Sequence, residues 1–228
     1  MYRVLDLFSG IGGFSLGLER TGGFKTVAFC EIEPFCRRVL AKHWPDVPRY
    51  DDVRTLTAER LAADGIAVDV ITGGFPCQDI SEAKQNAAGL QGEQSRLGLE
   101  FLRIVGETRP KRVIIENSHL LRRRGLGDIL RTLDSFGYDA EWHVLRASDV
   151  GAPTRRKRLY LVAYPHGVAE IWPSVSWQEC DPWPAEPGLP RVAHGVPNQP
   201  LFRHALGNAV VPQIPELIGR AILQAEAA

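Results

Sequence analysis

Short apolar runs alternate with stretches in which apolar residues recur every three or four positions, from the N-terminus to about residue 164. The runs are typical of strands, several of them apolar on both faces, and the three-to-four spacing is typical of helices. The expected strands are residues 3–7, 26–31, 68–72, 112–116, 140–146 and 158–162. The expected helices are residues 14–19, 34–43, 97–107 and 126–136. This alternation predicts an α/β fold with a mostly parallel sheet flanked by helices.

The pattern changes after residue 164. Proline recurs between residues 165 and 200, Trp172, Trp177 and Trp183 cluster there, and no periodicity lasts long enough to indicate an element. Residues 212–226 regain a helical pattern. We therefore expect a main domain at residues 1–164, a small irregular insertion at 165–200, and a C-terminal segment at 201–228 that returns to the main domain.

Composition and charge narrow the class of protein. The 228 residues are 44% hydrophobic and 24% charged, with 27 basic and 27 acidic side chains, as in a folded globular protein rather than a disordered one. No apolar run approaches the roughly 20 residues that span a bilayer, and Arg3 and Asp6 interrupt any signal-peptide core, so we expect a cytoplasmic protein without membrane contact. Zero net charge argues against a general polyanion-binding surface but leaves room for a local basic patch.

The four cysteines are too few for a disulfide framework in a chain of this length. The sequence contains neither a Cys-x-x-Cys nor a His-Glu-x-x-His spacing that would indicate a metal site. We therefore expect reduced thiols and no bound metal.

The first candidate site is the sequence Asp6-Leu7-Phe8-Ser9-Gly10-Ile11-Gly12-Gly13-Phe14, where a strand runs into a glycine-rich turn and a helix. Such glycines let a ligand approach the backbone at a helix N-terminus. Ser15 occupies the position of the third glycine in a dinucleotide fingerprint, which argues against a bound diphosphate. Glu31, at the end of the second strand, can accept hydrogen bonds from ribose hydroxyls. Together they predict an adenosine-containing cofactor; the alternative is a tight turn followed by a solvated glutamate.

Two further motifs directly follow predicted strands. They are Gly73-Gly74-Phe75-Pro76-Cys77-Gln78 and Glu116-Asn117-Ser118. Because the carboxyl ends of parallel strands line the ligand crevice, we expect the Cys77 thiol and the Glu116 carboxyl group at one edge of the sheet. This pairing is what covalent catalysis with acid assistance requires. The alternatives are a small buried hydrophobe for Cys77 and a loop cap for Glu116 and Asn117.

Two basic runs follow these segments. Arg122-Arg123-Arg124 comes after the Glu116 loop, and Thr154-Arg155-Arg156-Lys157-Arg158 leads into the last predicted strand. We expect both near the same edge, in contact with backbone phosphates or with a substrate carboxylate or carboxamide. The alternative is a solvated charged surface.

Taken in order, the motifs resemble those of the DNA cytosine C5 methyltransferase family over nearly the whole chain outside residues 165–190. The segment from Asp6 to Gly13 is similar to the family's cofactor loop, Pro76-Cys77-Gln78 to its catalytic loop, Glu116-Asn117 to its acidic motif, and Arg156-x-Arg158 to its paired-arginine motif. Residues 207–212 resemble its closing motif, in which the C-terminal helix completes the cofactor pocket. The resemblance implies a Rossmann-like methyltransferase fold with S-adenosyl-L-methionine as cofactor.

The resemblance also assigns roles to single residues. It implies that Phe8 lies against the adenine, Glu31 binds the ribose, Asp52 lies near the adenine amine, and Asn208 lies by the methionine carboxylate. The complete set of expected cofactor-binding residues is Asp6, Phe8, Ser9, Gly10, Ile11, Gly12, Gly13, Glu31, Ile32, Asp52, Val53, Gly74, Pro76, Leu97, Asn208 and Ala209.

The implied reaction transfers a methyl group to C5 of a flipped-out cytosine in double-stranded DNA. Cys77 attacks C6, Glu116 protonates or hydrogen-bonds N3, and loss of the C5 proton then expels the thiolate. Arg158 and Arg156 would hold the base and a neighbouring phosphate, so the expected catalytic residues are Cys77, Glu116, Arg156 and Arg158. The family suggests a monomer that protects bacterial or phage DNA, with a cognate restriction endonuclease as a partner.

The sequence departs from the family pattern in three places. Ser118 and Thr154 stand where the family usually has Val and Gln, and neither replaces a group that makes or breaks a bond. Residues 165–190 are short for a target-recognition region, so we expect a short or relaxed target sequence. The three tryptophans there either stack on bases or form a small hydrophobic cluster.

Two alternative functions stay open on the sequence. One is methylation of cytosine in structured RNA, and the other is a truncated homologue that binds cofactor or DNA without turnover. A nicotinamide dehydrogenase is disfavoured, because Ser15 breaks the fingerprint and such an enzyme has no use for Cys77 and Glu116 together.

Overall fold

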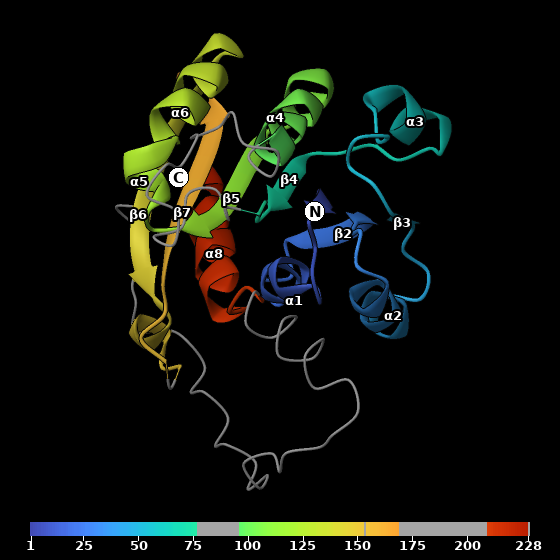
Figure 1. Ribbon diagram of the computed structural model, residues 1–228, viewed down its shortest axis with the longest axis horizontal. Helices are drawn as coiled ribbons and strands as arrows, with labels where there is room; N and C mark the ends of the chain where they lie inside the picture. Colours follow the sequence, from blue (N-terminus) through green and yellow to red (C-terminus); the bar gives the residue numbers. More distant parts are fainter. Residues whose placement is uncertain (77–95, 153, 169–208, 228) are drawn as a thin grey trace, which may run out of the picture.

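The computed structural model describes residues 1–76, 96–152, 154–168 and 209–227, which form a seven-stranded sheet with helices on both faces (Figure 1). The strands are β1 (Tyr2–Leu7), β2 (Phe24–Cys30), β3 (Arg49–Tyr50), β4 (Val70–Gly73), β5 (Arg112–Ser118), β6 (Tyr138–Arg146) and β7 (Lys157–Pro165). The helices are α1 (Gly13–Glu19), α2 (Pro34–His43), α3 (Ala58–Ala63), α4 (Arg96–Thr108), α5 (Leu121–Arg124), α6 (Leu126–Ser135) and α8 (Gln213–Ala227), with the 3-10 turn η3 (Ala147–Val150). Within these ranges, no helix is long and apolar enough to cross a membrane.

The strand order is β3-β2-β1-β4-β5-β7-β6. All neighbours from β3 to β5 pair in parallel, whereas β7 is antiparallel to both β5 and β6. The mostly parallel, helix-flanked sheet predicted from the sequence is confirmed. The reversed direction of β7 has a simple cause: only residues 147–156 join it to β6, and a parallel neighbour needs a crossover of about a dozen or more residues.

Every predicted strand and helix is present, with ends that differ by about three residues or fewer. Four short elements were not predicted, namely β3, α3, α5 and η3, because each is too short to show a period. The predicted insertion falls largely on residues 169–208, which lie outside the described residues. The division of the chain into three parts therefore stays a prediction.

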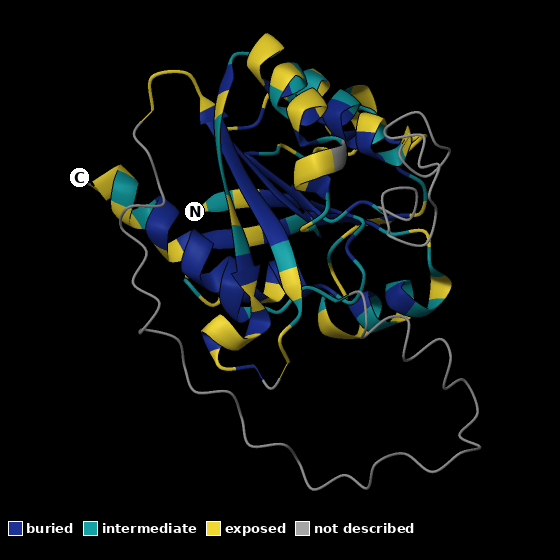
Figure 2. Cartoon of the chain, turned by 60° about the vertical axis from the view of Figure 1, so that its left-hand side comes forward, coloured by how far each residue is buried: buried dark blue, intermediate teal, exposed yellow. Residues whose placement is uncertain are grey.

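The two faces of the sheet carry separate hydrophobic cores. Helices α1 and α8 pack on one face, against alternate strand residues that include Ile114 of β5 and Val162 of β7. Helices α4 and α6 pack on the other face, against the residues in between. Figure 2 shows the buried strands between helices whose outer surfaces are exposed. Because side chains alternate along a strand, Glu116 and Arg158 lie on the same face as Ile114 and Val162, which α1 and α8 cover.

The chain that enters α8 crosses α1 at two glycines. A Cβ atom at Gly13 would lie 2.4 Å from the Val210 carbonyl oxygen, and one at Gly17 would lie 2.1 Å from that of Pro212. Only glycine allows so close a backbone approach. The contact holds residues 209–212, which we call the closing segment, against the start of α1.

A buried carboxyl group links two strands and a helix beneath the glycine-rich turn. Asp6 has no exposed surface, and its two oxygens accept hydrogen bonds from Thr72 Oγ1 in β4 (2.7 Å) and Ser15 Oγ in α1 (2.9 Å). Burial raises the pKa of Asp6 to about 7, although both hydroxyls act against the rise. Ser15, which breaks the dinucleotide fingerprint, thus has a buried partner.

Gly17→Ala is expected to lower the free energy of unfolding by about 1–3 kcal/mol, because the new methyl group would overlap the Pro212 carbonyl and α1 or the closing segment must move. Urea denaturation measures the change. Gly127→Ala, in α6, is the matched control: its Cβ would approach only Arg131 Nη1, at 3.7 Å, so alanine should be neutral or stabilising. Equal stability of Gly17→Ala and the wild type would contradict this close contact.

Asp6→Asn is expected to remove a pH dependence of stability. The folded pKa of about 7 exceeds the unfolded value of about 3.9, so this group stabilises the fold fully below about pH 4 and loses that contribution as the pH rises towards 7. The free energy of unfolding of the wild type, relative to Asp6→Asn, should therefore fall over that range by about 1.4 kcal/mol for each unit of pKa shift. Urea denaturation at a series of pH values measures the difference.

Asp69→Asn is a control for which the pH dependence of stability has the opposite sign. Arg3 lowers the pKa of Asp69 to about 2, so ionised Asp69 stabilises the fold above about pH 4, and this contribution is lost as the pH falls towards 2. A wild-type-to-Asp6→Asn difference that stays constant with pH would show that folding does not shift the pKa of Asp6.

Candidate active site

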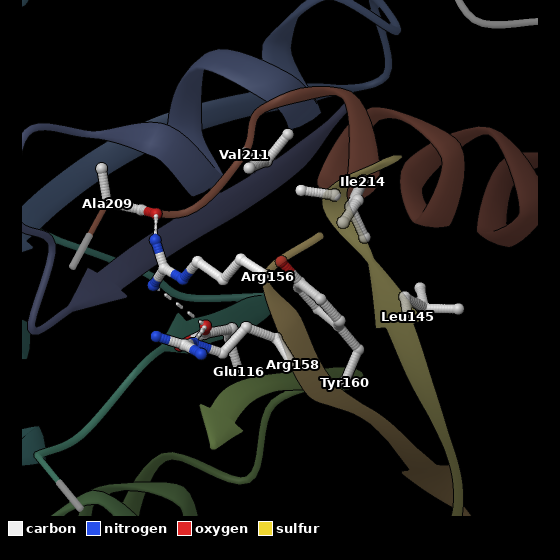
Figure 3. A pocket seen from close by; sticks show the side chains of 9 residues that line it. Glu116, Leu145, Arg156, Arg158, Tyr160, Ala209, Val211 and Ile214 are labelled. Carbon is white, nitrogen blue, oxygen red and sulfur yellow. Dashed lines mark hydrogen bonds and ion pairs between the residues drawn. The ribbon is translucent and has the colours of Figure 1, made fainter. Parts of the chain in front are cut away.

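A buried carboxyl group lies near the carboxyl end of β5. The Glu116 side chain is 9% exposed, and its Oε1 lies 2.8 Å from Arg158 Nε and 3.7 Å from Arg156 Nη2 (Figure 3). The antiparallel register pairs Tyr160 of β7 with Glu116, and Arg158 with Ser118. Side chains two residues apart on facing strands are diagonal neighbours, so this register brings Arg158 to Glu116.

Burial controls the protonation of this carboxyl group. It raises the pKa of Glu116 above the ordinary carboxyl value, and the charges of Arg158 and Arg156 act against the rise. The short contact with Arg158 is an ion pair rather than an aligned hydrogen bond, since Oε1 is buried without a hydrogen-bond partner in the described part of the chain. A carboxyl group with a raised pKa can hold a proton near neutral pH and donate it to a substrate.

The strand next to β5 brings the chain that leads to Cys77 against Glu116. A Cβ atom at Gly74 would lie 2.9 Å from Glu116 Oε2, so a larger residue there would displace the Glu116 carboxyl group. One residue further, the Phe75 carbonyl accepts a hydrogen bond from Asn117 Nδ2 at 3.1 Å. The acidic motif therefore fixes the start of the predicted catalytic loop, although Cys77 itself lies outside the described residues.

A cleft opens beside Glu116 between β6, β7 and the closing segment (Figure 3). Charged groups of Glu116, Arg156 and Arg158 line one side of it. The remaining lining residues are Leu145, Ala147, Tyr160, Ala209, Val211 and Ile214. Arg156 Nη1 donates a hydrogen bond to the Ala209 carbonyl at 2.8 Å, so the closing segment is held against the charged side.

The glycine-rich turn has a strained backbone that is tied to the end of β2. Phe8, Gly10 and Gly12 have positive φ angles of 51°, 54° and 87°. Gly10 N donates to Glu31 Oε2 at 2.7 Å, and Glu33 N donates to Glu31 Oε1 at 2.8 Å. A Cβ atom at Gly10 would meet nothing within 4 Å, so the backbone there borders open space into which a ligand can fit.

A tryptophan at the end of α2 supports this turn from behind. A Cβ atom at Gly12 would lie 2.6 Å from the Trp44 ring, and Trp44 Nε1 donates a hydrogen bond to Glu19 Oε2 at 2.9 Å. The ring also packs edge-on against Phe29, with centroids 5.3 Å apart. The sequence did not indicate Trp44 as part of the site, because its contacts join distant segments and leave no local pattern.

Parallel strands bring most of the predicted site residues to one edge of the sheet. The turn at residues 8–13 follows β1, Glu31 follows β2, Asp52 follows β3, Gly74 follows β4, and Glu116 lies near the end of β5. The antiparallel β7 brings its first residues to the same edge, because Ser118 pairs with Arg158. Gly74 and Phe75 thus lie against the acidic motif at this edge, and the position of the Cys77 thiol stays a prediction.

Other expected cofactor residues have partners of their own. Asp52 pairs with Arg54 at 2.6 Å, and the buried Val53 accepts a hydrogen bond from Arg103 Nη2 through its carbonyl at 3.0 Å. The Ile32 side chain is 63% exposed. Asp6 lies beneath the turn, and Ser9 Oγ donates hydrogen bonds to the Asp6 and Cys30 carbonyls. Ile11 lies in the turn, and Gly13 contacts the Val210 carbonyl. Leu97 lies in α4, and the Ala209 carbonyl accepts a hydrogen bond from Arg156. Asn208 lies outside the described residues.

The described cysteines outside the site are inert. Burial raises the pKa of Cys30 to about 12 and that of Cys36 to about 11, so neither forms a thiolate near neutral pH. Within the described ranges, no group of three or more His, Cys, Asp or Glu side chains could hold a metal ion.

Comparisons with known proteins find that the chain is similar to type II methyltransferases. The chain is 34% identical over 167 residues to type II methyltransferase M1.ScrFI of Lactococcus lactis subsp. cremoris. The aligned residues make up 72% of this chain and 41% of that protein. It is 36% identical to type II methyltransferase M.CviJI of Paramecium bursaria Chlorella virus IL3A, over 71% of this chain and 43% of that protein. The chain thus spans less than half the length of either relative.

A solved structure supports the fold assignment. It is that of a proposed DNA modification methyltransferase encoded within a prophage (E. coli), with 28% identity and a TM-score of 0.67 over 80% of this chain and 52% of that chain. The predicted Rossmann-like methyltransferase fold is therefore confirmed. The sequence model of the C-5 cytosine-specific DNA methylases matches residues 2–181, which is most of the chain. The protein belongs to the C-5 cytosine-specific DNA methylase family.

Proposed function

We propose that this protein transfers a methyl group from S-adenosyl-L-methionine to C5 of cytosine in double-stranded DNA. The observation that carries the proposal is the buried Glu116 carboxyl group, which has Arg158 2.8 Å away on one side and Gly74, three residues before Cys77, on the other. A proton donor beside a loop that bears a nucleophile is the arrangement that covalent activation of a pyrimidine requires. The relatives named type II methyltransferases support the same reaction.

The glycine-rich turn has the properties of a cofactor site. S-adenosyl-L-methionine is the cofactor of this family, and when bound it supplies an electrophilic methyl group on a sulfonium. The open backbone at Gly10 fits a bound ligand, and each Glu31 oxygen keeps a lone pair for a ribose hydroxyl after accepting one backbone N–H. We assign Phe8 to the adenine, Asp52 to its amine, and Asn208 to the methionine carboxylate.

The chemistry on the base follows from the reactivity of cytosine. C5 is a poor nucleophile, so the Cys77 thiolate first forms a bond to C6 while Glu116 gives a proton or a hydrogen bond to N3. The ring electrons then make C5 nucleophilic, and C5 takes the methyl group. Loss of the C5 proton restores the double bond and expels the thiolate. The target base must be flipped out first, because C6 is buried in the base stack.

Exposed basic side chains lie close in sequence to Glu116 and Arg158. Arg122 and Arg123 lie in α5, which begins shortly after β5, Arg155 lies just before β7, and Lys157 is its first residue. We assign these four side chains, which we call the basic rim, to contacts with DNA phosphates, which position the duplex without reading its sequence. We also propose that the protein acts as a monomer and protects DNA from a cognate restriction endonuclease. The names of the relatives, type II methyltransferases, support the restriction-modification role.

Cys77→Ser is expected to abolish methyl transfer from labelled S-adenosyl-L-methionine to duplex DNA, because a serine hydroxyl is far less ionised than a thiol. Bisulfite sequencing of DNA from cells that express the wild type would identify the methylated cytosines. Cys36→Ser is the matched control and should retain transfer, since Cys36 is buried in α2 with a raised pKa. Transfer by Cys77→Ser, or transfer to a competing structured RNA instead of duplex DNA, would refute the proposal.

Arg122→Gln is expected to weaken DNA binding to all sequences alike and to reduce the slope of log affinity against log salt concentration by about 1, because one phosphate contact is lost. Fluorescence anisotropy with a labelled duplex at several salt concentrations measures the slope. Lys25→Gln is the control, since Lys25 is exposed near the start of β2, at the opposite edge of the sheet. Equal slopes for both variants would remove Arg122 from the basic rim.

A further inference from the structure

We propose that Arg156 is a positioning residue that couples the closing segment to the Glu116 carboxyl group. Arg156 Nη1 donates a hydrogen bond to the Ala209 carbonyl at 2.8 Å, and Nη2 lies 3.7 Å from Glu116 Oε1 (Figure 3). One guanidinium therefore joins a backbone carbonyl of the closing segment to the proposed proton donor. The inference deepens the proposed function and rests on it.

The environment of Arg156 is that of an internal link rather than a phosphate ligand. Its side chain is 19% exposed, and its Nε is buried without a hydrogen-bond partner among the described residues. Burial and the neighbouring Arg158 lower the pKa of Arg156, but an arginine remains charged in proteins. The planar fork of a guanidinium can hold two acceptors in fixed directions, which a lysine ammonium cannot do.

Arg158 has a different position beside the same carboxyl group. It makes the shorter contact with Glu116, its side chain is 28% exposed, and its Nη1 donates to the Lys157 carbonyl at 2.9 Å. Arg158 is thus the more exposed of the two arginines beside Glu116, and we assign it to the base. The two arginines of the motif therefore have different roles: Arg158 faces the substrate, and Arg156 contacts the closing segment.

The link continues from the closing segment to the glycine-rich turn. Ala209 precedes Val210, whose carbonyl packs on Gly13, the first residue of α1 and the last residue of the turn. A ligand that orders the turn therefore also orders the closing segment, and through Ala209 it orders Arg156 and Glu116. Because coupling between two sites is reciprocal, a base that contacts Glu116 should tighten cofactor binding by the same factor.

The experiment compares the full chain with Arg156→Gln, Arg156→Lys and the control Arg131→Gln, which changes an exposed arginine of α6 on the other face of the sheet. Calorimetry measures the affinity for S-adenosyl-L-methionine with and without duplex DNA, and initial rates give kcat and KM for the cofactor between about pH 5 and 9. Circular dichroism and thermal melting establish that each variant folds. Arg156→Lys keeps the charge and the aliphatic stem, so it tests the link even if Arg156→Gln does not fold.

Arg156→Gln is expected to lower kcat about tenfold and to abolish most of the tightening of cofactor binding by DNA. The pH limb assigned to Glu116 should move to higher pH, because one of the two positive charges that lower the pKa of Glu116 is removed. Arg156→Lys should restore the position of this limb, since the charge remains, but not the coupling, since the fork is lost. Arg131→Gln should match the wild type in cofactor affinity with and without DNA and in the pH profile.

Two results would overturn the inference. If the wild type binds S-adenosyl-L-methionine and transfers methyl groups, but Arg156→Gln retains wild-type coupling and an unshifted pH limb, Arg156 has no positioning role and the proposed function stands. If the wild type neither binds the cofactor nor transfers methyl groups, the proposed function fails and the inference fails with it.

Discussion

The ion pair between Glu116 and Arg158 is the interaction on which the site depends. Moving a carboxylate out of water costs several kcal/mol, so Glu116 can remain buried and ionisable only with a cation close by. The direction of β7 provides that cation. Because β7 is antiparallel to β5, its first residues reach the edge where β5 ends, and Arg158 lies diagonally across from Glu116 on the same face. A parallel β7 would have placed both arginines at the opposite edge, away from the turn at residues 8–13 and from Gly74.

The parallel strands of the sheet bring the other groups of the site to the same edge. Five strands end at one edge, so groups separated by more than one hundred residues meet there without long loops to position them. Two close backbone contacts then complete the arrangement: the closing segment on Gly13 and Gly17, and Gly74 on Glu116. At Gly13 and Gly17 glycine is required because a backbone carbonyl occupies the place of a Cβ atom, and at Gly74 a Cβ atom would displace the Glu116 carboxyl group. The glycines of this site therefore serve packing at least as much as ligand access.

Much of this arrangement was predictable from the sequence, and the exceptions have physical reasons. Periodicity located the long elements, and the position of Glu31, Gly74 and Glu116 directly after apolar runs predicted their meeting at one edge. The place of β7 between β5 and β6 was not predictable, because a run that is apolar on both faces does not show which strands lie beside it. The hydrogen bond from Arg156 to the Ala209 carbonyl was not predictable either, because every residue has a backbone carbonyl and the sequence does not show which one accepts.

The distribution of charge along the edge agrees with a division between two ligands. Glu31 follows β2, whereas the region of β5 and β7 carries the two arginines at Glu116 and the basic rim. Ribose hydroxyls suit the half of the edge with Glu31, and a polyanion suits the basic half. Glu116 and Arg156 lie on the basic side of this division, where the contact with the closing segment connects the two halves, so a methyl donor and a base bound in their respective halves would meet beside Glu116.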